Sequence, residues 1–152
     1  MKRIRVLLTI VLLCLLLGCQ QPFSYCADEN TIWIVVELDL ADPVYEIAVA
    51  YETDAGWNGL RGGSNADGSA ITDPTFGFDF LREDFPNDAM FDEMTFDFYI
   101  RTEPEKPDMT VTGMVEVGAV RIPVRFGEVH RVHISNKDGT CTVEYLGKDE
   151  SK

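Results

Sequence analysis

The chain has 152 residues and a formal net charge of −13, from 13 Lys and Arg against 26 Asp and Glu, and 45% of its residues are hydrophobic. This length and this composition predict one globular domain. So acidic a chain repels the phosphates of nucleic acids, and an aromatic content of 11% is too high for a disordered acidic tail, so both classes are excluded.

The N-terminal segment has the pattern of an export signal. Positively charged residues at positions 2, 3 and 5 precede an apolar run over residues 6–17, which is shorter than the roughly 20 residues of a membrane-spanning helix. The run ends in a Leu-Leu-Gly-Cys motif at Cys19, which resembles the lipobox of bacterial lipoproteins. The resemblance covers residues 1–19. It implies that residues 1–18 are removed as a signal peptide and that Cys19 becomes the lipidated N-terminus.

The same resemblance implies a location and a first partner. A chain carrying two or more acyl groups on Cys19 would be exported and stably anchored to a bacterial membrane in the cell envelope. Residues 19–30 would then form the lipidated N-terminus and a short tether. The alternatives are an ordinary secretory signal with an incidental cysteine, or an uncleaved anchor.

Two of the four cysteines remain for the folded domain, because Cys14 leaves with the signal and Cys19 takes the lipid. An exported pair is more often a disulfide than two free thiols, so we expect a bridge between Cys26 and Cys141. It would tie the two ends of the chain together. Residues 20–25 would then separate the lipid from the bridge by at most about 20 Å.

Alternating apolar and polar residues predict β-strands throughout a domain at residues 31–147, followed by a polar tail at 148–152. The predicted strands lie at residues 31–38, 45–52, 76–80, 96–100, 109–117, 120–126, 132–134 and 141–145. The first is apolar on both faces and is expected to be central, whereas Pro123 predicts an edge strand. The turn signal at residues 136–139 predicts a hairpin. Residues 84–94 are expected to be a loop or a single helical turn.

This pattern predicts an all-β fold, an antiparallel β-sandwich of seven or eight strands of the immunoglobulin-like kind. A small closed β-barrel is the alternative.

No catalytic site is predicted, and we expect the protein not to be an enzyme. His130 and His133 are three residues apart in a predicted strand, so they lie on opposite faces and cannot form a two-histidine metal site there. We expect His130 to be half-buried or paired across strands and His133 to be exposed. The serines lie in no nucleophile-elbow context.

Calcium is the small-ion hypothesis, because clustered acidic side chains on loops supply the oxygen ligands that it needs. The candidate residues are Asp67, Asp73, Asp84 and Asp88. Their spacing is not that of an EF-hand, so solvated loops are the favoured interpretation. Apart from calcium and the lipid on Cys19, no cofactor is expected.

The longest stretch without a strand pattern, residues 53–73, predicts a glycine-rich loop around Trp57, Leu60 and Arg61. Such a loop could present Trp57 to a protein or a glycan at the cell surface, or Trp57 could fold back and cap the sandwich. The arginines at positions 121, 125 and 131 could form a basic row, or be neutralised by cross-strand glutamates. The predicted function is a non-catalytic binding or assembly module; the alternative is capture of a small ligand or calcium.

Overall fold

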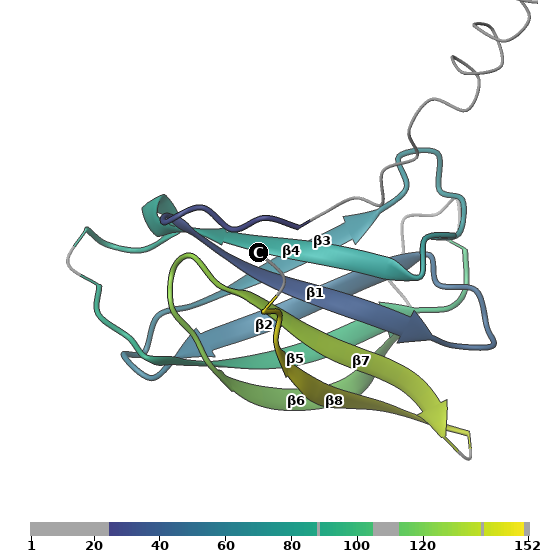
Figure 1. Ribbon diagram of the computed structural model, residues 1–152. Helices are drawn as coiled ribbons and strands as arrows, with labels where there is room; N and C mark the ends of the chain where they lie inside the picture. The colour runs from purple at the N-terminus through teal and green to yellow at the C-terminus, as the bar shows by residue number, and fades with distance from the viewer. Residues whose placement is uncertain (1–24, 88, 105–112, 138, 151–152) are drawn as a thin grey trace, which may run out of the picture.

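The computed structural model describes residues 25–150 except 88, 105–112 and 138 (Figure 1). The lipobox motif at Cys19 lies outside the described residues. The described part is almost entirely β-structure, with a short 3-10 helix, η1 (Arg82–Asp84). The strands are β1 (Thr31–Asp39), β2 (Glu46–Thr53), β3 (Asn58–Ser64), β4 (Thr75–Leu81), β5 (Glu93–Arg101), β6 (Met114–Pro123), β7 (Val129–Lys137) and β8 (Thr140–Lys148).

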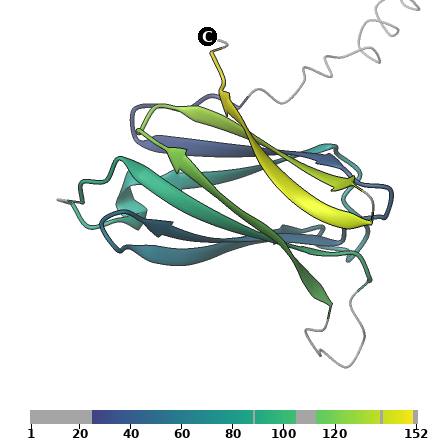
Figure 2. The ribbon, with the colours of Figure 1, turned by 90° about the horizontal axis from the view of Figure 1, so that it is seen from below.

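The strands form two four-stranded sheets packed face to face (Figure 2). The first sheet has the order β4-β1-β7-β8 and the second has the order β3-β2-β5-β6. Strands β1 and β7 run parallel, and every other pair is antiparallel. The sheets do not close into a barrel, so the predicted antiparallel sandwich of seven or eight strands is confirmed and the barrel alternative is wrong. The strands predicted at residues 109–117 and 120–126 are wrong as separate elements, because β6 runs through the turn expected at Gly118.

The core lies between the two sheets, as the alternating pattern predicts. The first sheet contributes Ile34 and Phe80 to it, and the second contributes Phe96 and Phe98; all four are fully or almost fully buried. Strand β1 lies between β4 and β7, which confirms its central position. Pro123 ends β6, an edge strand, where its missing N–H costs no sheet hydrogen bond.

The outer face of the first sheet is partly covered by the residues that precede β1. The ring of Tyr25 lies over Gly77 of β4 and packs on Trp33 of β1, with ring centroids 5.2 Å apart. Val35 also faces outward, yet it is fully buried. The apolar outward side of β1 is therefore covered by the chain's own N-terminal segment, which we call the N-terminal strap (residues 25–30).

Among the described residues, no helix has the length and the hydropathy needed to span a bilayer.

Candidate functional site

The predicted binding loop is wrong in its secondary structure, because residues 58–64 form strand β3. The chain turns between β2 and β3 at residues 54–56, where Gly56 takes the left-handed conformation with φ of 86°. The Thr53 side chain closes this turn, since its Oγ1 accepts a hydrogen bond from the Trp57 amide at 3.0 Å. Trp57 therefore lies at the end of a tight turn, and Leu60 and Arg61 lie within an edge strand.

The glycines of β3 explain why sequence patterning missed the strand. A Cβ on Gly59 would lie 2.5 Å from the Tyr51 hydroxyl oxygen, and one on Gly63 would lie 2.2 Å from the Phe76 ring. Both rings occupy the space that side chains of β3 would fill. These glycines are therefore needed for packing at the sandwich edge, although glycine normally argues against a strand.

Arg61 and Leu60 point to opposite sides of β3, because side chains alternate along a strand. The guanidinium of Arg61 lies 5.8 Å from the centre of the Phe80 ring and forms an ion pair with Asp84. Arg61 thus connects β3 to η1. Leu60 lies on the outer face of the second sheet beside Ala50, and 70% of it is exposed. Trp57 is 44% exposed, so it does not cap the sandwich in the way that the alternative expected.

The two cysteines form no disulfide with each other. Cys141 is the second residue of β8, beside the turn from β7, whereas Cys26 lines a cavity with Lys148 at the other end of β8. Lys148 lies seven positions after Cys141 along the strand, which is about 23 Å. A disulfide requires Cα atoms within about 7 Å. The prediction failed because β8 begins at the end of the sheet remote from the N-terminal strap.

Three of the four acidic residues proposed as calcium ligands accept hydrogen bonds from other groups of the protein. Asp67 accepts a hydrogen bond from the Ser69 amide, Asp73 from Thr75, and Asp84 from the Leu81 amide as well as from Arg61. No three Asp, Glu, His or Cys side chains in the described part of the chain approach one another as a metal site requires. Asp88 lies outside the described residues.

His130 is paired across strands and buried, with 1% exposed. Its Nδ1 lies 3.0 Å from the Tyr145 hydroxyl of β8, and its Nε2 lies 3.3 Å from Glu128 without hydrogen-bond geometry. Burial lowers the pKa of His130, against the opposing charge of Glu128. Burial raises the pKa of Glu128, but its hydrogen bond and ion pair with Lys148 outweigh this and lower it overall. His130 is therefore neutral at pH 7 and fixes the start of β7 against β8.

The three arginines of the proposed basic row are dispersed. Arg121 lies on β6 and pairs with Glu93 at 3.0 Å, whereas Arg131 lies on β7 in the other sheet and pairs with Glu37 and Asp149. Arg125 lies in the connection between these strands. The predicted basic row is therefore wrong, because the consecutive strands β6 and β7 belong to different sheets.

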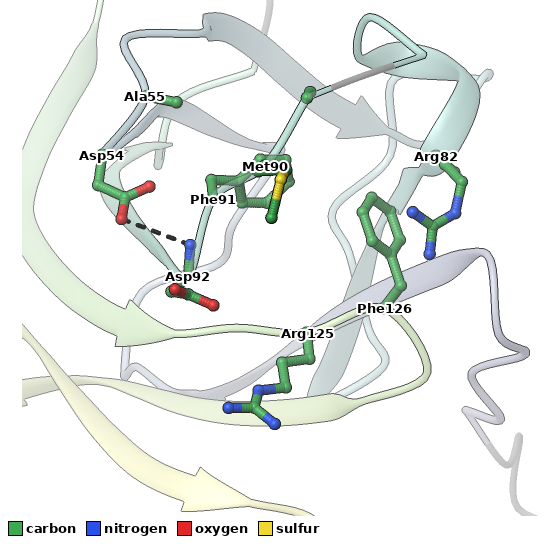
Figure 3. Close-up of a pocket in the computed structure, with 9 residues that line it drawn as sticks. Asp54, Ala55, Arg82, Met90, Phe91, Asp92, Arg125 and Phe126 are labelled. Carbon is green, nitrogen blue, oxygen red and sulfur yellow. Dashed lines mark hydrogen bonds between the residues drawn. The ribbon is translucent and has the colours of Figure 1, made fainter.

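Arg125 instead lines a pocket at one end of the sandwich, with a volume of about 490 Å³ (Figure 3). The pocket is built by the turn after β2, the β4–β5 connection and the β6–β7 connection. Its lining consists of Asp54, Ala55, Arg82, Ala89, Met90, Phe91, Asp92, Arg125 and Phe126. The sequence did not predict that these residues come together, because they lie in three connections that show no common sequence signal.

Comparisons with known proteins give no family assignment. No protein-family model matches the chain, and no curated protein matches it. Among solved structures, the human-specific toxin intermedilysin matches 78% of this chain at a TM-score of 0.38 and 9% identity. Wild-type pneumolysin matches 79% at a TM-score of 0.38 and 11% identity. The chain spans 24% of each of those proteins, and similarities this distant carry no argument about its function.

Proposed function

We propose that this protein is a membrane-anchored lipoprotein of the cell envelope whose folded domain is a non-catalytic binding module, with strand β3 as its binding surface. The single observation that carries the binding role is Leu60, a large apolar side chain that is 70% exposed on an edge strand. The anchor is supported by the lipobox motif at Cys19. The absence of a nucleophile-elbow serine from the sequence and the enclosure of His130 favour binding over catalysis.

Strand β3 is an edge with few devices against pairing. It is hydrogen-bonded to β2 alone, which leaves N–H and C=O groups along its other side for an incoming strand. Edge strand β6 ends in Pro123, and its pairing with β5 changes register between Phe98 and Tyr99. Edge strand β8 ends in Lys148, and its pairing with β7 changes register between Arg131 and Val132. In β3 the corresponding protection is one inward charge, Arg61, which Asp84 neutralises. An extended protein segment is therefore the partner that fits.

The N-terminal strap supports this choice of surface. Tyr25 packs on the outer face of the first sheet, and five residues separate it from Cys19. Five residues reach at most about 18 Å. A lipid on Cys19 would therefore hold the bilayer near the outer face of the first sheet. Leu60 lies on the outer face of the second sheet, which would then point away from the bilayer and toward partners.

Site-specific photo-crosslinking in the native cell tests this function. A photoreactive residue replacing Leu60 is expected to give one defined protein adduct, and Leu60→Asp is expected to abolish binding of that same protein. The matched control is Leu146, which is 49% exposed on edge strand β8 of the first sheet. The proposal fails if no adduct forms at position 60, or if the same adducts form equally well at position 146.

A further inference from the structure

The outer face of the second sheet carries more carboxylates than cations. The strand registers and the alternation of side chains place seven charged residues on this face: Glu46, Glu52, Glu93, Asp97, Glu116, Arg101 and Arg121. Both arginines are already paired, with Glu46 and Glu93 respectively. Among the described residues, no basic side chain pairs with Glu52, Asp97 or Glu116. Three carboxylates on this face therefore have no cation beside them.

The environment of Tyr99, at the centre of this face, is affected by this negative charge. The hydroxyl donates a hydrogen bond to Asp97 at 2.8 Å, which raises the pKa of Tyr99, and the charges of Asp97 and Glu116 add to this shift. The other carboxylate oxygen of Asp97, Oδ1, is enclosed and has no hydrogen-bond partner among the described residues. The face therefore has a negative potential that its own groups do not cancel.

Glu52 is the unpaired carboxylate that a strand added to β3 would reach. It lies on β2 opposite Asn58 of β3, and its side chain is exposed. The Cα atoms of an added strand would lie about 10 Å from those of β2, two strand spacings away. An extended lysine or arginine together with a glutamate spans this distance. Asp97 lies one strand further away, so it would attract such a residue through its field alone.

Leu60 stands beside an open space on the same face. The next outward position on β3 is Gly62, where a Cβ would have two neighbours within 4 Å, the Ile47 carbonyl oxygen at 3.6 Å and the Ala48 Cβ at 3.7 Å. The described residues therefore leave the space above Gly62 open. A large apolar side chain on an added strand, opposite Gly62, would lie against Leu60 and over Ala48.

We propose that the segment which pairs with β3 is basic, with a lysine or arginine beside Glu52 and a large apolar residue over Gly62. This inference rests on the proposed function, because it names the chemistry of the partner at the same surface. Asn58 and Gly62 lie four positions apart on one face, so the two partner residues are also four positions apart. The unpaired carboxylates attract such a segment and repel a second copy of this chain, whose net charge is −13.

Selection of random peptides on the immobilised full chain, purified from its own cells, tests the chemistry of the partner. The probe is a displayed library of random peptides, sequenced before and after selection. We expect enriched peptides to carry a lysine or arginine four positions from a large apolar residue. On Glu52→Gln the basic residue should no longer be enriched, whereas the apolar residue should remain. Glu144→Gln, which changes an exposed carboxylate on edge strand β8, is the matched control and should preserve both preferences.

Affinities of synthetic copies of the enriched peptides give the size of the effect. Glu52→Gln is expected to weaken binding about two- to fivefold at low salt, which is the range of one exposed ion pair. The difference should shrink at high salt, because exposed charges are then screened. Leu60→Ser, which leaves the charge unchanged, should abolish binding of these peptides through loss of the apolar contact.

The outcomes separate this inference from the proposed function. If no peptide is enriched on the wild type relative to Leu60→Ser, the binding role of β3 fails and the basic partner fails with it. If the enriched peptides depend on Leu60 but lack a basic residue, or bind Glu52→Gln as tightly as the wild type, the basic partner alone is overturned. Enrichment of sequences that match β3 itself would also overturn it, and would identify a second copy of this chain as the partner.

Discussion

Replacing Gly77 with alanine is expected to detach the N-terminal strap from the first sheet. The new Cβ would lie 2.2 Å from Cε1 of Tyr25 and 2.9 Å from two further atoms of its ring, closer than real contacts allow. The ring also packs against Trp33, at a centroid distance of 5.2 Å, and this contact holds it over Gly77. Tyr25 must therefore lift away from the sheet.

The expected cost of Gly77→Ala is about 1 to 3 kcal/mol of unfolding free energy, the usual range for overpacking a filled site. Loss of the contact between Tyr25 and Trp33 accounts for about 0.5 to 1.5 kcal/mol of this. For a domain of this size the melting temperature should fall by roughly 4 °C per kcal/mol. Denaturant titration and thermal melting, both followed by circular dichroism, measure these two quantities.

A double-mutant cycle isolates the clash from the general effect of alanine in a strand. In a Tyr25→Ala background, Gly77→Ala should cost almost nothing, because the ring that it meets is gone. Gly62→Ala is the matched control: it is also a strand glycine, and its Cβ would make ordinary contacts at 3.6 and 3.7 Å. If Gly77→Ala costs as much without Tyr25 as with it, the strap does not lie on the sheet and the argument for the domain's orientation fails.

Two further predictions concern the cysteines and the buried histidine. Cys141→Ser is expected to leave the unfolding free energy within about 1 kcal/mol of the wild type, rather than to remove the 2 to 5 kcal/mol of a native disulfide, and intact mass should not change on reduction. The lowered pKa of His130 makes the unfolded state bind more protons below pH 6.5, so stability should fall as the pH decreases from that value. Denaturant titrations at pH 7 and pH 5.5 measure this loss of unfolding free energy, which should be smaller in His130→Asn than in the wild type. His133→Asn is the matched control and should lose as much as the wild type. An unchanged loss in His130→Asn would contradict the lowered pKa of His130.

The alternation of side chains made most of the sandwich predictable. In β4 and β5 the apolar residues recur at every second position, and a single strand register then fixes which face enters the core. The cross-strand pairing of His130 followed from the same reasoning, since it lies in β7 opposite the last residues of β8. Strand β3 was not predicted because two of its three inward positions are glycines, Gly59 and Gly63. The rings of Tyr51 and Phe76 occupy the space at these two positions, and this leaves no apolar pattern in the sequence of β3 itself.

The disulfide and the basic row failed for a different reason, which is the order of strands in the sheets. Proximity in sequence suggested that Arg121 and Arg131 would be neighbours, and the position of Cys141 near the end of the chain suggested that it would meet Cys26. The chain instead crosses from the second sheet to the first between β6 and β7, and β8 starts at the far end of its sheet. Neither property can be derived from the residues of the strands concerned.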